Sequence, residues 1–220
     1  MTRVCVSVKA MSTNQVINQI NQACEADLIE VRLDYRREPI DLDNVRTSTG
    51  KPLIATNRRK DQGGQADEPE KDRVQLLLNA LRSGFEYVDL AYTTSELEKT
   101  IKRINSIEGK VIVSYHDFEE PLSLDHLMEI HDQSSSLGCD MVKIIGCAHD
   151  YMDNIPYMQY NKAKPGNISF AMGEKGAPSR ILAPLSGAAF TYASPSEGLE
   201  VAPGQISLRA LRGIYGVLSK

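Results

Sequence analysis

Two side chains that could take part in a reaction, an amine and an imidazole, lie within or directly after apolar segments of the sequence. Lys143 is the only polar residue of the run 141–145, where a charge needs either a partner or a function. A desolvated lysine amine attacks carbonyl carbons and forms Schiff bases, so a covalent role is one interpretation of Lys143. His116 follows the run 111–115 and would serve as a proton shuttle beside that amine. The alternatives are a structural ion pair for Lys143 and a structural histidine at 116.

Further charged residues stand inside or after other apolar runs. Glu30 and Arg32 are two residues apart, so both point to the same side of an expected strand. By themselves they are typical of a structural ion pair. Arg58 and Arg180 fall in different loops, and several arginines around one rim favour an anionic substrate.

Short β-branched runs alternate with longer segments of helical spacing, which predicts parallel strands joined by helical crossovers. Eight such units indicate a (β/α)8 TIM barrel, an α/β fold that residues 1–220 form as a single domain. An open doubly wound sheet is the alternative, but no Gly-x-Gly-x-x-Gly motif follows any run. Active sites of such barrels lie at the carboxyl ends of the strands, so the charged residues above are expected to meet there. The expected strands are 4–8, 28–33, 52–56, 87–90, 110–114, 141–145, 168–172 and 188–192, and the expected helices include 73–81, one that begins at Ser123, 150–159 and 205–218.

The composition is that of an ordinary globular protein, with 41% hydrophobic and 25% charged residues among 220. The 25 basic and 29 acidic residues give a net charge of −4, which argues against a surface for nucleic acid or anionic membrane. No apolar run approaches the roughly 18 residues of a membrane span. Cys5, Cys24, Cys139 and Cys147 are scattered, so we expect reduced thiols and a cytoplasmic location. Cys147 and His149 lack a second ligand pair at a recognised spacing, which argues against a metal site.

Several blocks of residues combine along the whole chain in a specific order, although each block alone is weakly specific. They are Ile-Glu-Val-Arg-Leu-Asp at 29–34, Ala-Thr-Asn-Arg at 55–58 with Gly-Gly at 63–64, Ser-x-His-Asp-Phe at 114–118, Val-Lys-Ile at 142–144, Met-Gly-x-x-Gly at 172–176 with Ser-Arg at 179–180, and Ala-Pro-Gly-Gln at 202–205. In these blocks the chain resembles the type I 3-dehydroquinate dehydratases, the Schiff-base dehydroquinases of the shikimate pathway.

The resemblance implies the dehydration of 3-dehydroquinate to 3-dehydroshikimate without metal or cofactor. Lys143 would form an imine with the C3 ketone, and His116 would act as base at C2 and then as acid at the C1 hydroxyl. The segment 194–201 resembles a lid, and a homodimer is expected because members of the family are often dimers. The implied substrate contacts are Arg180 and Gln205 at the carboxylate, Glu30, Arg32 and Arg58 at the ring hydroxyls, and Ser7 as a weaker candidate.

Two positions depart from the family pattern. Gln62 stands where the family often has a glutamate that orients the catalytic histidine, and glutamine cannot stabilise an imidazolium by charge. Either Asp61 takes that role after a shift of the loop, or His116 has a weaker orienting partner. Val201 replaces a common hydroxyl residue, so one side-chain hydrogen bond to the substrate is expected to be missing.

Two other functions are compatible with parts of the pattern. A Schiff-base aldolase would share Lys143 and the barrel, but it would not explain Arg180 and Gln205 at a carboxylate. A barrel that binds a small acid without catalysis is favoured only by Gln62 and Val201. Turnover of phosphorylated sugars would distinguish the aldolase from the dehydroquinase.

Overall fold

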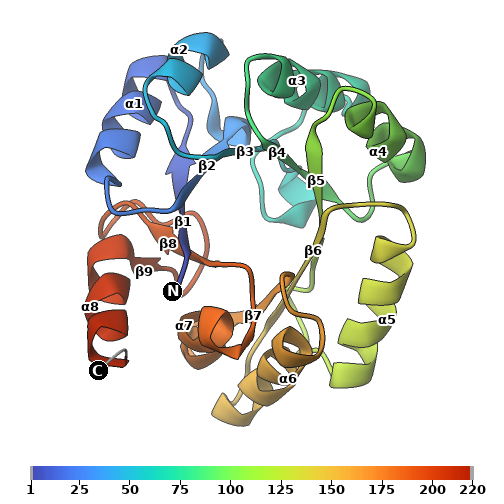
Figure 1. Cartoon of the computed structure of the whole chain (residues 1–220), viewed down its shortest axis with the longest axis vertical. Coiled ribbons are helices and arrows are strands. Elements are labelled where there is room, and N and C mark those ends of the chain that lie inside the picture. Colours follow the sequence, from blue (N-terminus) through green and yellow to red (C-terminus); the bar gives the residue numbers. More distant parts are fainter. Residues whose placement is uncertain (1, 219–220) are drawn as a thin grey trace.

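The β-branched runs form parallel strands in the computed structural model, which describes residues 2–218. Strands β1 to β7 pair in chain order and β1 also pairs with β8, so the sheet curls into a barrel with the helices outside (Figure 1). The strands are β1 (Val4–Lys9), β2 (Leu28–Arg32), β3 (Leu53–Thr56), β4 (Tyr87–Ala91), β5 (Lys110–His116), β6 (Met141–Cys147), β7 (Ile168–Met172), β8 (Thr191–Ser194) and the short β9 (Ile206–Ser207).

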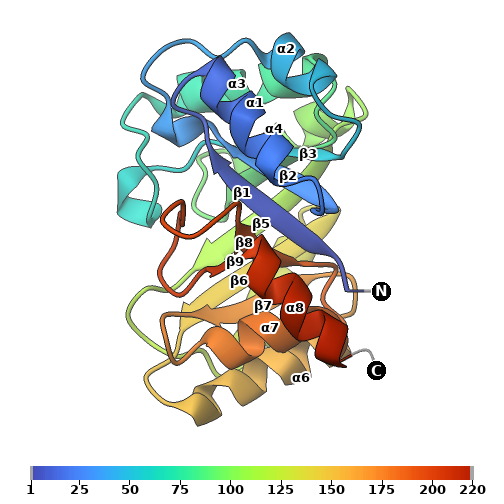
Figure 2. The same ribbon diagram turned by 90° about the vertical axis from the view of Figure 1, so that its left-hand side faces the viewer.

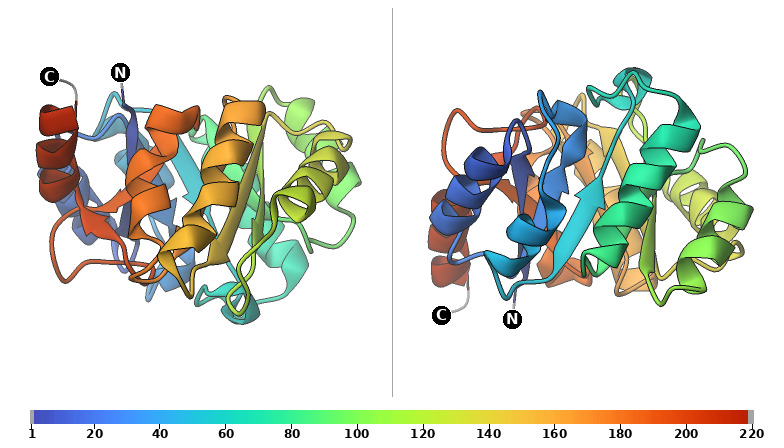
Figure 3. Two further views of the ribbon diagram at one scale, coloured as in Figure 1. Left: turned by 90° about the horizontal axis from the view of Figure 1, so that it is seen from below. Right: turned by 90° about the horizontal axis from the view of Figure 1, so that it is seen from above.

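Helices follow the strands and cover their outer faces, as Figure 3 shows from two opposite sides. None of the helices within residues 2–218 has both the length and the apolarity that a bilayer span requires. The α-helices are α1 (Thr13–Gln22), α2 (Leu42–Thr47), α3 (Glu70–Arg82), α4 (Leu97–Asn105), α5 (Leu124–Ser135), α6 (Ile155–Ala163), α7 (Ala177–Ser186) and α8 (Leu208–Leu218), and the 3₁₀ segments are η1 (Leu33–Tyr35), η2 (Lys60–Gln62) and η3 (Tyr151–Asn154).

Local sequence signals explain where several helices begin. The hydroxyl of Ser123 accepts from the backbone N–H of His126, so α5 begins where the sequence predicts. Ser12 and Asp41 cap α1 and α2 in the same way. The last helix, α8, lies beside the start of β1 (Figure 2), and its Arg212 donates to the backbone oxygen of Thr2.

The TIM-barrel prediction is confirmed, with two corrections to its eighth unit. The strand expected at 188–192 lies at Thr191–Ser194 instead. The apolar residues at the start of the expected strand do not pair in the sheet, because Ala188 and Phe190 pack in the buried apolar cluster inside the barrel. The second correction is the pair of residues in β9, which extends the sheet from β8. The ladder within residues 2–218 has no pairing between β7 and β8.

The side chains on the inner face of the strands change from apolar to polar toward the carboxyl ends. Residues two apart on a strand share a face, and on most strands an apolar residue deep in the barrel is followed by a polar residue nearer the rim; β7 is the exception, with Phe170 two positions after Ile168. The apolar layer includes Cys5, Leu28, Ile54, Ile112 and Ile168. The polar residues two positions on, at the carboxyl side, include Ser7, Glu30, Thr56 and Ser114. This gradient fixes a buried polar site at the rim that the sequence predicts.

Candidate active site

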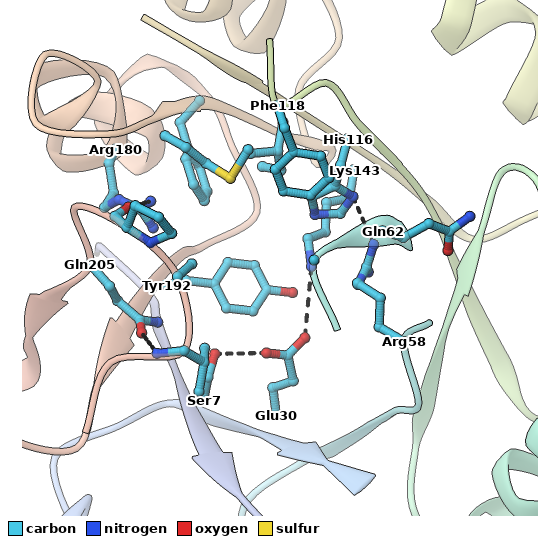
Figure 4. Close-up of a pocket in the computed structure, with 17 residues that line it drawn as sticks. Ser7, Glu30, Arg58, Gln62, His116, Phe118, Lys143, Arg180, Tyr192 and Gln205 are labelled. Carbon is cyan, nitrogen blue, oxygen red and sulfur yellow. Dashed lines mark hydrogen bonds and ion pairs between the residues drawn. The ribbon is translucent and has the colours of Figure 1, made fainter. Parts of the chain in front are cut away.

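A cavity of about 280 Å³ opens at the carboxyl ends of the strands (Figure 4). The structure brings seven of the eight predicted site residues into its lining. They come from both halves of the chain and are Ser7, Glu30, Arg58, His116, Lys143, Arg180 and Gln205. Arg32 is the exception, because it is not part of this lining and its guanidinium pairs with both oxygens of Asp34 at 2.9 and 2.7 Å.

The amine of Lys143 lies in a buried polar cluster, and the residue has 6% of its surface exposed. Its Nζ donates to Oδ2 of Asp89 at 3.0 Å and lies 3.7 Å from Oε1 of Glu30. The ring of Tyr192 covers the amine, with 4.4 Å between Nζ and the ring centroid. Two carboxylates and an aromatic face therefore hold this amine where the cavity reaches it.

Glu30 is fixed by neighbours on both sides of β2. The hydroxyl of Ser7 donates to its Oε2 at 2.7 Å, and the hydroxyl of Thr56 donates to its Oε1 at 2.9 Å. Burial opposes its charge, but Lys143 and Arg32 outweigh burial and lower the pKa of Glu30. Glu30 is thus a carboxylate paired with Lys143. The prediction of an ion pair between Glu30 and Arg32 is wrong, because Arg32 pairs with Asp34 and Glu30 lies beside Lys143.

Arg58 orients the ring of His116. Its Nη1 lies 2.8 Å from Nδ1 of the imidazole, and its Nη2 donates to Oδ1 of Asp89 at 2.6 Å. Since arginine is a donor without an acceptor atom, Nδ1 accepts and the neutral ring carries its proton on Nε2. Burial, Arg58 and Lys143 all lower the pKa of His116 well below 6.5. The ring is therefore neutral, and the lone pair of Nδ1 accepts the hydrogen bond from Arg58.

The loop after β3 contains Asp61 and Gln62, and its structure shows whether either side chain contacts His116. The amide nitrogen of Gln62 donates to the hydroxyl of Thr93, and Asp61 pairs with Arg59 at 2.6 Å on the surface. Neither side chain bonds His116, so the second of the two expectations fits and Arg58 is the orienting partner. The conformation of the loop explains why the second residue of the Gly-Gly pair, Gly64, is a glycine. A Cβ on Gly64 would collide with the backbone carbonyl of Arg58, so only glycine lets the loop fold back here.

Arg180 offers a buried positive charge to the cavity. Its guanidinium carbon lies 4.4 Å from the centroid of the Phe170 ring, and its Nη2 makes one long hydrogen bond of 3.4 Å to the backbone oxygen of Pro203. Its Nε is buried without a partner within residues 2–218. Burial lowers the pKa of Arg180 to about 10, so the group stays charged at neutral pH. This arrangement suits an anionic ligand, because a carboxylate would complete the guanidinium's hydrogen bonds.

The segment that follows β8 closes one side of the cavity. The backbone N–H of Val201 donates to Oε1 of Gln205 at 2.8 Å, so the side chain of Gln205 stabilises the turn formed by residues 201–205. Val201 and Pro203 face the cavity, and Gly204 lies against the backbone of Gly173 where a Cβ would not fit. Of the segment 194–201 only Val201 lines the cavity, and the contact with the loop after β7 is made by Pro203 and Gly204, so a lid at 194–201 stays a prediction.

Comparison with known proteins identifies the family. A family model described as type I 3-dehydroquinase matches residues 4–220. The chain belongs to this family. It is 36% identical over 220 residues to the 3-dehydroquinate dehydratase of Desulfotalea psychrophila, which covers 97% of this chain and 96% of that protein. It is 33% identical over 211 residues to the protein of the same name in Thermococcus gammatolerans, with 96% of each covered.

A solved structure supports the same conclusion. The crystal structure of 3-dehydroquinate dehydratase from Geobacillus kaustophilus has a TM-score of 0.89 and 25% identity to the chain, and the match covers 100% of this chain and 91% of that one. As a type I dehydroquinase the chain is a hydro-lyase. Within residues 2–218 no group of three or more His, Cys, Asp or Glu residues is placed to hold a metal ion.

The type I dehydroquinase site contains residues to which the sequence assigned no role. Asp89 is 4% exposed in β4 and bonds both Lys143 and Arg58. The signal was present, since Asp89 is a carboxylate inside an apolar run just as Lys143 is an amine inside one. Phe118 stacks on His116 with 5.9 Å between ring centroids and 17° between planes. That contact and the cover of Lys143 by Tyr192 depend on loop and strand placement that residue types do not reveal.

Proposed function

We propose that the chain dehydrates 3-dehydroquinate to 3-dehydroshikimate in the shikimate pathway, with Lys143 as the Schiff-base residue and His116 as the general acid and base. One observation carries this proposal. Lys143, His116 and the guanidinium of Arg180, whose Nε has no partner within residues 2–218, line a single cavity, which matches a ketone, a transferable proton and a carboxylate in one substrate. Figure 4 shows Arg180 on the opposite side of the view from His116 and Lys143.

Imine formation is the first step. The Nζ of Lys143 bonds to C3 of the ketone, the carbonyl oxygen leaves as water, and the resulting iminium withdraws electrons from the C2–H bond. Glu30 and Asp89 are carboxylates within 3.7 and 3.0 Å of Nζ and stabilise the positive charge of the iminium. The cover of Tyr192 keeps bulk water from this nitrogen.

Proton transfer through His116 follows. Nδ1 accepts the C2 proton once Arg58 turns its Nη1 from the ring to a substrate hydroxyl. The electrons of the C2–H bond form an enamine, the C1 hydroxyl takes the proton from His116, and it leaves as water. Water then hydrolyses the imine, which releases the product and restores the amine of Lys143. The net change is the loss of one water molecule, with no metal or cofactor in any step.

Substrate orientation comes from the rest of the rim. Arg180 and Gln205 hold the carboxylate, while Glu30, Arg58 and Ser7 lie along the cavity where ring hydroxyls would lie. Direct contact of Arg32 with the substrate stays a prediction, and it requires the bidentate pair with Asp34 to turn toward the cavity. A catalytic domain that spans 1–220 and a homodimer also stay predictions.

Borohydride trapping with 3-dehydroquinate, followed by peptide mass spectrometry, tests the proposal. The expected result is a reduced adduct on Lys143 in the wild type and in the control Lys175→Met, whose lysine is exposed, and none in Lys143→Met. An adduct on another lysine would contradict the assignment of Lys143. A folded protein that forms neither adduct nor enone product would instead support the acid-binding barrel, and turnover of phosphorylated sugars would support the aldolase.

A further inference from the structure

The carboxylate of Asp89 stands where the hydrogen bonds of both reactive side chains meet. It is 4% exposed and lies in β4, between β5, which carries Ser114, and β3, after which Arg58 follows. Its Oδ2 accepts from Nζ of Lys143 at 3.0 Å. Its Oδ1 accepts from Nη2 of Arg58 at 2.6 Å and from the hydroxyl of Ser114 at 2.6 Å. The other terminal nitrogen of Arg58 is the one that bonds Nδ1 of His116.

These contacts form a continuous chain from Lys143 through Asp89 and Arg58 to His116. The two carboxylate oxygens are fixed relative to each other, so they set the separation between the amine and the guanidinium. Asp89 also lies between two cations that would repel each other without it. It does not line the cavity, and so it would act through its partners rather than on a substrate.

We propose that Asp89 is the positioning residue of this site, holding Lys143 directly and His116 through Arg58 so that the amine and the imidazole face one substrate together. The assignment of these two groups to one reaction rests on the proposed function. The link from Asp89 through Arg58 to His116 does not depend on the proposed function, because it concerns only the tautomer and orientation of the His116 ring. The two parts can therefore be tested separately.

The variant Asp89→Asn is the direct test. An amide keeps the shape but has one oxygen and one NH₂ group, so it accepts from Lys143 or from Arg58 and turns a donor toward the other. We expect kcat to fall by at least about 100-fold, the size of losing one preorganised electrostatic contact. KM changes little, since Asp89 does not line the cavity. Glu86→Gln is the control, because its carboxylate holds the backbone of Leu53 at the other end of the strands.

Nitrogen-15 NMR of the histidine ring gives a readout that needs no turnover. In the wild type, Nδ1 of His116 is expected as an unprotonated acceptor and Nε2 as the protonated nitrogen. In Asp89→Asn, Arg58 loses its ion pair and keeps only the hydrogen bond from Nη2 to the hydroxyl of Ser114 near this carboxylate, so the two nitrogen shifts are expected to move toward each other as the tautomers mix. The His116→Asn spectrum assigns the signals. Unchanged shifts in Asp89→Asn would overturn the positioning of His116, whatever the activity.

A second variant covers the case in which Asp89→Asn does not fold. Ser114→Ala removes the hydroxyl that donates to Oδ1 of Asp89 and accepts from Nη2 of Arg58, and it keeps the charge of Asp89, so a loss of about fivefold in kcat is expected. Wild-type kcat in both variants would overturn the proposal while the proposed function stood. A wild type that does not dehydrate 3-dehydroquinate would overturn the proposed function, and the ring shifts would still decide the link from Asp89 to His116.

Discussion

The guanidinium of Arg180 lies over the ring of Phe170 and pairs with no carboxylate in the part of the chain that the structure describes. An aromatic face and one long hydrogen bond compensate only part of the cost of burying a charge. Such a buried charge lowers the stability of the protein, and the carboxylate of the proposed substrate would supply the missing partner. Stability and substrate binding are therefore expected to change in opposite directions when this arginine is replaced.

The variant Arg180→Met tests that relation. Methionine fills much of the same volume without charge, so we expect unfolding to become less favourable by about 1 to 4 kcal/mol and Tm to rise. KM for 3-dehydroquinate is expected to rise by about 10- to 100-fold, because charge-assisted hydrogen bonds to the carboxylate are lost. Thermal unfolding and steady-state kinetics measure the two effects.

The matched control is Arg73→Met. Arg73 is equally buried, but it donates to the backbone oxygen of Asn57 at 2.6 Å and pairs with Glu70 at 3.0 Å. Its loss is expected to lower Tm and to leave KM unchanged. A lower Tm with an unchanged KM in Arg180→Met as well would remove Arg180 from the binding site.

The pH dependence of catalysis follows from the surroundings of His116. Its pKa is lowered well below 6.5 by burial first and then by Arg58 and Lys143. In the proposed mechanism the unprotonated ring is the base, so activity is expected to be lost as the pH falls through this pKa, and a lowered pKa moves the loss to lower pH. We expect the acid limb of the kcat/KM profile below pH 6.5. An acid limb above that value would contradict the neutral, cation-flanked ring.

The sequence predicts the fold well because period and alternation are local properties. Seven of the eight expected strands overlap the observed ones almost fully, and the eighth is displaced because Phe190 packs in the core instead of pairing. The alternation also places Lys143 and Glu30 on the inner face. It does not choose partners. Arg32 pairs with Asp34 rather than Glu30 because the chain turns into η1 directly after β2. Asp89 bonds both Lys143 and Arg58 because the stagger between strands brings these three residues together.

The variant Gly64→Ala tests whether the loop after β3 positions Arg58. A Cβ at this glycine would collide with the carbonyl of Arg58, so the backbone of Arg58 must shift. Overpacking of this kind costs about 1 to 3 kcal/mol of stability, and a displaced Arg58 is expected to lower kcat at least about tenfold. Gly50→Ala is the control, since no atom lies within 4 Å of a Cβ there. Equal kinetics in both variants would mean that the loop does not set the position of Arg58.

The variant Gln62→Glu tests how the glutamine at position 62, where the family often has a glutamate, affects His116. Gln62 and His116 line the same cavity, and the side-chain oxygen of Gln62 is buried without a partner within residues 2–218. A carboxylate at this position would favour the imidazolium, raise the pKa of His116 and move the acid limb of kcat/KM to higher pH. Asp61→Asn is the control, because Asp61 is paired with Arg59 at the surface and is expected to leave the limb in place. If Asp61→Asn moved the limb and Gln62→Glu did not, then Asp61 rather than Arg58 would orient His116 in solution.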